Sequence, residues 1–161
     1  MGYYVEEICT EKTLDIMKAI DTEVYGFVTE IEWYRDRYLG TAKVLVVSND
    51  NGVVVGYAAF VGLKTKAYKL MREGYISGDF SLSPKAYTTA RDSKGKIYLS
   101  ITISGDDSSS EKLMVEALKA SGISCSVLCI VEDYSLISQF QIDSTAKTMS
   151  GATEIAEVFI Y

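Results

Sequence analysis

The chain has 161 residues, of which 48% are hydrophobic and 24% charged, a balance typical of one globular domain over residues 1–161 that excludes a disordered chain. No apolar run approaches the roughly 20 residues that cross a bilayer, and residues 1–10 lack the pattern of a signal peptide, so a cytoplasmic protein without membrane association is expected. The absence of histidine excludes Ser-His and Cys-His nucleophiles and imidazole-dependent metal sites, and no metal is expected.

The net charge of −6 is unevenly distributed along the chain. Residues 1–40 and 96–161 each carry 4 basic and 9 acidic side chains, whereas residues 63–95 carry 7 basic and 3 acidic ones, a net of +4. An anionic ligand or partner is therefore least repelled by this central segment. Because no stripe of Lys and Arg extends beyond it, nucleic-acid binding is disfavoured.

The first third of the chain predicts a strand, two helices and a hairpin. Apolar residues recur at three- and four-residue steps from Thr13, the expected N-cap, and Gly26 is expected to divide this stretch into two helices. The sequence Asn51-Gly52 between two β-branched runs indicates an antiparallel hairpin. The expected elements are a strand at 3–9, helices from Thr13 to near Gly40, and strands at 43–48 and 53–63.

Residues 64–95 form the irregular part of the chain. A short basic helix over 65–73, stopped by Gly74, is expected at its start, and the rest is rich in Gly, Ser, Thr and Tyr. Loops of this length in compact domains are uncommon and often functional. We interpret the segment as an insertion that is either a flap or substrate-recognition element, or a surface decoration.

The last third predicts a strand, a helix and two further strands. Alternation over 97–103 indicates a half-buried strand with Tyr98, Ser100 and Thr102 facing solvent. The run at 126–131 is apolar on both faces, as expected of a central strand, and the strand-helix-strand order implies a parallel pair within a mixed sheet. The remaining elements are a helix from Ser108 to Gly122, one or two helical turns over 134–140, and a closing strand over 152–161.

Two of the three cysteines, Cys125 and Cys129, fall within this predicted central strand. At about 3.3 Å per residue they lie roughly 13 Å apart, beyond disulfide reach. We interpret them as small buried apolar residues in a reducing compartment.

In this element order, and in the hairpin sequence from Asn51 to Ala59 (NGVVVGYAA), the chain resembles the GNAT superfamily of acyl-CoA N-acyltransferases. The resemblance covers nearly the whole chain. It implies an α/β fold with a mixed sheet, in which 1–161 is a single GNAT-like domain with an insertion at about 64–95. The alternative is a different α/β domain that shares only the order of elements.

In the family, a loop of the form Gln/Arg-x-x-Gly-x-Gly/Ala opens the main helix and holds the pyrophosphate of acyl-CoA. The corresponding residues are 105–110, with serine at both glycine positions. The resemblance implies that acetyl-CoA or another acyl-CoA lies with its pantetheine arm against the amides of Ile101 to Ile103. Its pyrophosphate would face Ser108, Ser109 and Ser110.

Two carboxylates in this loop, Asp106 and Asp107, argue against phosphate binding there, because their negative charges would lie near the negatively charged diphosphate. In the other interpretation, an aspartate or serine here only caps the helix, whose dipole favours a negative charge without any ligand.

The family's general base is often a glutamate on the strand before the loop, where this chain has no carboxylate. The nearest replacements are Glu132 and Asp133, at the end of the next strand. In the family a tyrosine acts as the general acid, and Phe140 occupies its position here. Tyr134 is therefore the candidate general acid. Alternatively, Tyr134 is a half-buried aromatic residue that anchors the loop.

The leading hypothesis is an N-acyltransferase that moves an acetyl or longer acyl group from CoA to the amine of a small molecule or peptide. Residues 64–95 would form part of the acceptor site. The alternative is a GNAT-like binding or regulatory module without catalysis, which the altered loop and Phe140 favour.

Overall fold

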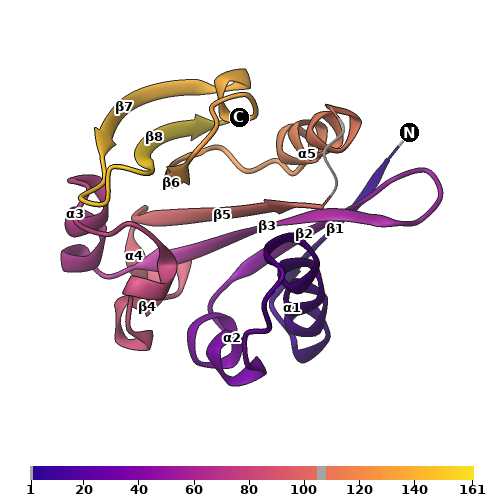
Figure 1. Cartoon of the computed structure of the whole chain (residues 1–161), viewed down its shortest axis with the longest axis horizontal. Coiled ribbons are helices and arrows are strands. Elements are labelled where there is room, and N and C mark those ends of the chain that lie inside the picture. The colour runs from indigo at the N-terminus through magenta and orange to yellow at the C-terminus, as the bar shows by residue number, and fades with distance from the viewer. Residues whose placement is uncertain (1, 105–107) are drawn as a thin grey trace.

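A computed structural model describes residues 2–104 and 108–161, and in it an eight-stranded sheet carries helices on both faces (Figure 1). The strands are β1 (Tyr3–Ile8), β2 (Lys43–Ser48), β3 (Val54–Leu63), β4 (Tyr87–Thr88), β5 (Ile97–Ile103), β6 (Cys125–Val131), β7 (Gln141–Lys147) and β8 (Glu154–Ile160). The helices are α1 (Glu11–Tyr25), α2 (Ile31–Tyr38), α3 (Thr65–Arg72), α4 (Ala90–Ser93) and α5 (Ser108–Ala120), with short 3-10 turns η1 (Asp79–Ser81), η2 (Pro84–Ala86) and η3 (Ile137–Gln139).

The strand order is β1-β2-β3-β5-β6-β8-β7, with the short β4 paired to β3. Every pair is antiparallel except β5 and β6, which run parallel on either side of the α5 crossover. The expected mixed α/β sheet is confirmed, and so is the interior position of 126–131.

The parallel pair is short. β5 pairs with β3 over its whole length, but with β6 only at Ile97↔Val127 and Tyr98↔Leu128. β6 in turn pairs with β8 throughout. The two central strands therefore diverge beyond Tyr98, and the sheet opens between them.

Each face of the sheet has its own core, because side chains alternate along a strand. In β3, Tyr57, Ala59 and Val61 belong to the core between the sheet and helices α1 and α2. Ala58 and Phe60 belong to the core between the sheet and α5. Figure 1 shows α1 and α2 below the sheet and α5 above it.

The start of α1 lies one turn earlier than the sequence suggested. Thr10, not Thr13, is the N-cap, and the two threonines form a reciprocal capping box. The Thr13 hydroxyl also donates to Glu7 Oε1 at 2.7 Å. Gly26 ends the helix at φ 74°, a conformation that glycine adopts without a Cβ penalty, as the sequence predicted.

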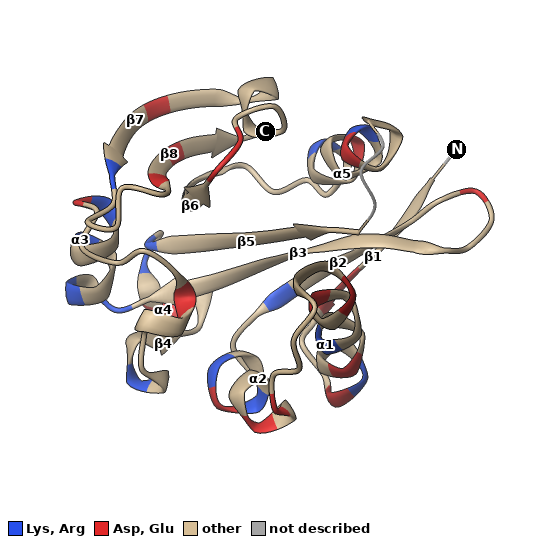
Figure 2. Cartoon of the chain, viewed as in Figure 1, with Lys and Arg blue, Asp and Glu red and all other residues tan. Residues whose placement is uncertain are grey.

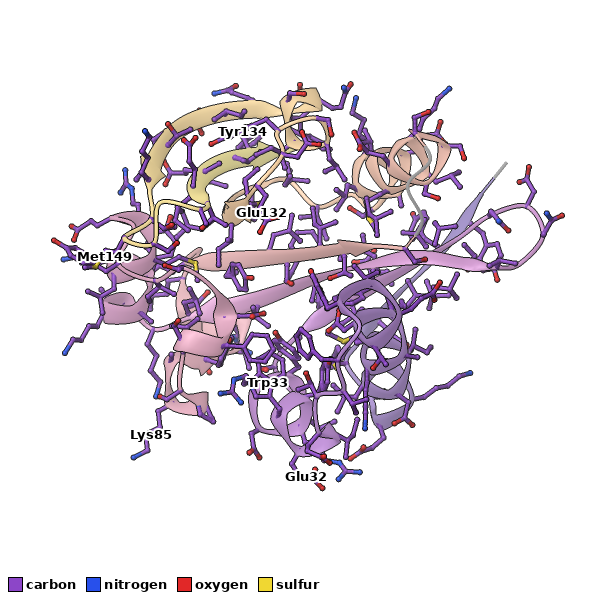
Figure 3. The ribbon with its side chains drawn as sticks, in the orientation of Figure 1. Glu32, Trp33, Lys85, Glu132, Tyr134 and Met149 are labelled. Atoms are coloured by element: carbon purple, nitrogen blue, oxygen red, sulfur yellow. The ribbon has the colours of Figure 1, made fainter. Side chains whose placement is uncertain are left out.

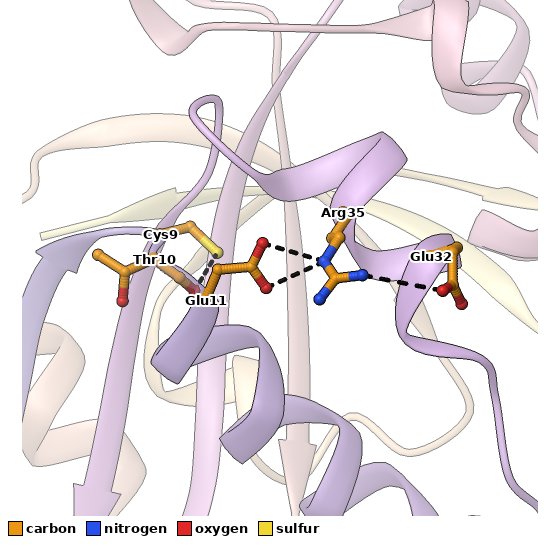
Figure 4. Close-up of polar contacts among 5 residues, drawn as sticks. All are labelled: Cys9, Thr10, Glu11, Glu32 and Arg35. Atoms are coloured by element: carbon orange, nitrogen blue, oxygen red, sulfur yellow. Dashed lines mark hydrogen bonds and ion pairs between the residues drawn. The ribbon is translucent and has the colours of Figure 1, made fainter.

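An ion pair connects the first two helices at the surface. Arg35 Nε on α2 lies 3.0 Å from Glu11 Oε1 on α1, and Arg35 Nη1 lies 3.8 Å from Glu32 Oε1 (Figure 4). All three side chains are exposed, so these pairs contribute little to stability. The α1–α2 layer is held mainly by its buried side chains.

Three features differ from the sequence prediction. β7 was not predicted, because it is an edge strand whose mostly exposed polar residues carry no apolar alternation. Tyr98 and Thr102 do not face solvent: each side chain is 4% exposed on the face that α1 covers. Within 64–95, the predicted basic helix is present as α3, but the segment also contains β4, which pairs with the end of β3.

The three cysteines are free, with Cys9 and Cys129 buried and Cys125 half-buried. Burial raises the pKa of Cys129 to about 12. Among the described residues, no helix is both long and apolar enough to cross a membrane.

Candidate functional site

The divergence of β5 and β6 opens a cavity of about 660 Å³, within the size range of small-molecule sites. One wall is β5 from Tyr98 to Ile103, and the other is the end of β6 with the following residues 132–133 and 135–137. Val24 and Tyr25 from the end of α1, and residues 77–79 from the central segment, close it on a third side. Four regions distant in sequence therefore meet at the place where the sheet opens.

The β5 wall presents backbone groups that no strand engages. Leu63 N–H donates to the Lys96 carbonyl and Ser104 N–H to the Val55 carbonyl, both at 2.8 Å, which places the even-numbered residues of β5 in the ladder with β3. Because such bonds alternate in an antiparallel pair, the odd-numbered residues point the other way. Among the described residues, no strand pairs with Leu99, Ile101 or Ile103 on that side.

The charges on the cavity wall are all negative. Of the described residues that line it, Asp79, Glu111, Glu132 and Asp133 are charged, and none is Lys or Arg. The basic segment contributes only Ser77, Gly78 and Asp79 to the wall. Figure 2 shows the Lys and Arg of this segment on α3 and around α4. The cavity therefore favours a cationic group.

Three of the sequence-predicted site residues line this cavity, namely Ile101, Ile103 and Glu132. Glu132 is exposed and follows the last residue of β6 directly. Tyr134 is half-buried and does not line the cavity: its hydroxyl donates to Glu154 Oε2 on β8 at 3.2 Å. In the view of Figure 3, Glu132 lies nearer to β5 than Tyr134 does.

The three predicted serines form the first turn of α5, with Ser108 and Ser109 exposed and Ser110 buried. The same turn reaches the cavity through Glu111, whose Oε2 accepts a 3.1 Å hydrogen bond from the Ser135 hydroxyl. The loop residues Gly105, Asp106 and Asp107 lie outside the described residues.

Sequence reasoning missed Asp79, the first residue of η1. The Tyr38 hydroxyl donates to Asp79 Oδ2 at 3.1 Å, and burial, reinforced by the negative charge of Asp21, raises the pKa of this cavity-lining carboxyl. A carboxylate with a raised pKa in a cavity is a typical functional residue. Its only signal in the sequence is its place beside Gly78 within the segment interpreted as substrate recognition.

A second carboxylate in this region belongs to Asp21 of α1. It accepts hydrogen bonds from the Tyr34 hydroxyl at 2.7 Å and the Tyr57 hydroxyl at 2.9 Å. Burial raises its pKa, although these two hydroxyls oppose the shift. Tyr25 and Tyr98 line the cavity near these acids, and burial raises the pKa of both phenols above the ordinary value of 10.0.

The described residues contain no group of three or more Cys, Asp or Glu placed to hold a metal ion. The arrangement instead offers hydrogen-bonding backbone, phenols and carboxylates along the cavity wall. It can bind an extended amide-containing ligand along β5 and a cation near Asp79.

The structure is similar to solved acetyltransferases. The acetyltransferase of the GNAT family from Bacillus cereus ATCC 10987 matches with a TM-score of 0.50 and 12% identity, over 98% of this chain and 96% of that one. Arabidopsis thaliana NAA60 in complex with acetyl-CoA matches with a TM-score of 0.51 and 14% identity, over 99% of each chain. The ribosomal-protein-S18-alanine N-acetyltransferase from Escherichia coli matches with a TM-score of 0.50 and 8% identity, over 98% of this chain and 93% of that one.

At these identities the likeness is one of fold. No family model matches the sequence, and no curated protein matches it.

Proposed function

Because the chain has the fold of the GNAT acetyltransferases, we propose that it is an acyl-CoA-dependent N-acyltransferase. The observation that carries this proposal is the cavity along the unpaired edge of β5, where the sheet opens beside β6. Support also comes from a protein of this fold, Arabidopsis thaliana NAA60, whose structure holds acetyl-CoA.

The unpaired edge suits the pantetheine arm of an acyl-CoA, which is extended and contains two amides. Backbone N–H and C=O groups of Leu99, Ile101 and Ile103 would bond these amides as a neighbouring strand would. The diphosphate would then reach the first turn of α5, where Ser108 to Ser110 stand at the positive end of a 13-residue helix.

The chemistry requires removal of a proton from the attacking amine and protonation of the departing thiolate. As base we propose Glu132, the carboxylate that follows β6 and lines the cavity. As acid we keep Tyr134 and add Tyr25, because Tyr25 lines the cavity whereas the Tyr134 hydroxyl is bonded to Glu154. The amine would attack the thioester carbonyl, and collapse of the tetrahedral intermediate would release CoA and the amide.

A second candidate function is a binding or regulatory module that uses the same cavity without catalysis. Two observations favour it: the charged groups on the cavity wall are acidic and would repel the phosphates of CoA, and the Tyr134 hydroxyl already has a carboxylate partner. The two functions differ first in whether acetyl-CoA binds at all.

Isothermal titration with acetyl-CoA tests the proposal through the N–H of residue 101. Ile101→Pro removes this group without breaking the β3–β5 ladder, since it points away from β3. We expect affinity to fall by about tenfold, the usual cost of losing a ligand hydrogen bond in a closed site. Ile101→Ala keeps the N–H and should bind within about threefold of the wild type.

Ser100→Pro tests the assignment of the N–H directions. The Ser100 N–H bonds to β3, so losing it should lower the melting temperature markedly. Absence of acetyl-CoA binding to the folded wild type at millimolar ligand would favour the binding module instead. Equal affinities for Ile101→Pro and Ile101→Ala would place the ligand elsewhere than along β5.

A further inference from the structure

A continuous series of aromatic rings begins at the cavity wall with Tyr25. Tyr25, which lines the cavity, stacks on Phe27 with ring centroids 6.1 Å apart, and Phe27 lies 6.2 Å from Phe80. Phe80 stacks on Trp33 at 4.7 Å, and the Arg37 guanidinium covers the Trp33 ring at 4.5 Å. The series thus runs from the cavity wall onto the surface between α1, α2 and η1.

Three of these rings are more exposed than buried. Tyr25 is 55% exposed, Phe27 52% and Phe80 60%. Single exposed apolar side chains are ordinary, but a contiguous aromatic patch beside a cavity is typical of a binding surface. We name Tyr25, Phe27 and Phe80 the aromatic rim.

The aromatic rim is joined to a carboxylate. Phe80 directly follows Asp79, whose side chain lines the cavity and is held by the Tyr38 hydroxyl at 3.1 Å. Arg37, whose charge acts on Asp79, lies over Trp33 outside the cavity, whereas the charged residues on the described wall are all acidic, so the wall itself is complementary to a cation. Ammonium groups bind well where a carboxylate and aromatic faces converge.

We infer that the aromatic rim and Asp79 form an acceptor subsite for an amphipathic monoamine, in which one ammonium group is attached to an aromatic or aliphatic body. This inference rests on the proposed function, in which the amine is the acyl acceptor. The ammonium lies against Asp79 and the apolar body lies on Phe80 and Phe27. A polyamine would use the carboxylates but leave the ring faces in water.

The chain's only tryptophan reports this subsite directly, because Trp33 stacks on Phe80. Titration with 2-phenylethylamine, with and without saturating CoA, should change Trp33 fluorescence and saturate. Ethylamine should bind at least about tenfold more weakly, because it lacks the apolar body. Spermidine should also bind more weakly than 2-phenylethylamine.

Two variants test separately how the Asp79 charge and the Phe80 ring contribute to amine binding. Asp79→Asn should weaken 2-phenylethylamine by about tenfold, as expected for loss of a charge-assisted hydrogen bond. Phe80→Ala should weaken it by about fivefold while weakening ethylamine by less than about twofold. Since removal of Phe80 also changes the surroundings of Trp33, this variant is titrated by calorimetry.

Matched controls lie far from the rim. Asp143→Asn on β7 makes the same charge change, and Tyr3→Ala on β1 removes a ring that is 51% exposed. Both should stay within about twofold of the wild type. Phe80 is exposed, so Phe80→Ala should fold even if Asp79→Asn does not, and melting curves check both.

The outcomes distinguish the two proposals. Binding of 2-phenylethylamine that Asp79→Asn and Phe80→Ala weaken supports the subsite, whether or not acetyl-CoA binds. Acetyl-CoA binding without any amine binding would overturn the subsite and leave the acyltransferase proposal intact. Tighter binding of spermidine or of a lysine-containing peptide than of 2-phenylethylamine would also overturn it, because neither preference depends on the rings.

Discussion

The two faces of the sheet are packed with different kinds of side chain. The core beneath α1 and α2 contains five buried tyrosines, Tyr34, Tyr38, Tyr57, Tyr87 and Tyr98, whereas the core beneath α5 is mainly aliphatic and contains no buried tyrosine among the described residues. The carboxylates Asp21 and Asp79 receive their phenolic hydrogen bonds on the first face. An aliphatic core stabilises by burial alone, whereas phenols also donate hydrogen bonds to carboxyl groups inside the protein.

The difference coincides with the position of the candidate site. Tyr25, Asp79 and Tyr98 all reach the cavity from the tyrosine-rich face. Tyr87 Oη and Arg37 Nε, also in this region, are the buried side-chain polar atoms without a hydrogen-bond partner among the described residues. Buried polar groups without a hydrogen-bond partner lower the stability of the folded state. We therefore expect this face to be less stable than it could be, because its polar groups serve the site.

The largest expected effect tests the aliphatic face. Leu118 of α5 is fully buried, and Leu118→Ala should lower the free energy of unfolding by roughly 2–5 kcal/mol through lost burial and a residual cavity. Urea unfolding at several pH values measures this, and the loss should not depend on pH because no ionisable group is involved. Leu70→Ala on α3, where the side chain is 36% exposed, should cost much less. A loss of stability for Leu118→Ala that varies with pH would show that the core covered by α5 is coupled to an ionisable group.

A smaller, pH-dependent effect is expected on the tyrosine-rich face. Burial raises the pKa of Asp21 above its ordinary value of 3.8, so the folded protein binds this proton more tightly than the unfolded chain does. The contribution of Asp21 to stability is therefore greatest below that ordinary value, and it falls as the pH rises through the raised pKa of the folded state. Asp21→Asn should remove this part of the pH dependence, as read from the difference between wild-type and variant unfolding curves.

Asp143→Asn on the exposed edge strand β7 is the matched control and should leave the pH profile unchanged. A difference curve for Asp21→Asn that is flat with pH, or that rises where a fall is expected, would show that burial does not raise the pKa of Asp21 in the folded protein.

The sequence predicted the parts of the fold that local signals determine. The hairpin at Gly52, the helix stop at Gly26 and the interior strand at 126–131 follow from turn residues and from a continuous apolar run. β7 was not predicted because it forms by pairing with β8, and its own sequence has no apolar alternation. Local periodicity does not report such tertiary pairing.

The site was predicted less completely, for a related reason. Ile101, Ile103 and Glu132 line the cavity, and the sequence pointed to them because they lie on or directly after the strands that the family resemblance aligns. Asp79 and the aromatic rim were not predicted, because their proximity depends on how residues 77–80 fold back against α1 and α2. Alternation suggested that Tyr98 faces solvent, whereas the helices that cover this face make it part of the core.

Amide hydrogen exchange measured by NMR, with and without acetyl-CoA, tests whether acetyl-CoA binds along the open edge of β5. In the free protein, the N–H groups of Ser100 and Thr102 should already exchange slowly because they bond to β3, whereas those of Ile101 and Ile103 should exchange faster. We expect acetyl-CoA to slow exchange of the Ile101 and Ile103 amides and to leave exchange of the Ser100 and Thr102 amides unchanged. Unchanged exchange at Ile101 and Ile103 with acetyl-CoA bound would contradict binding along the open edge of β5.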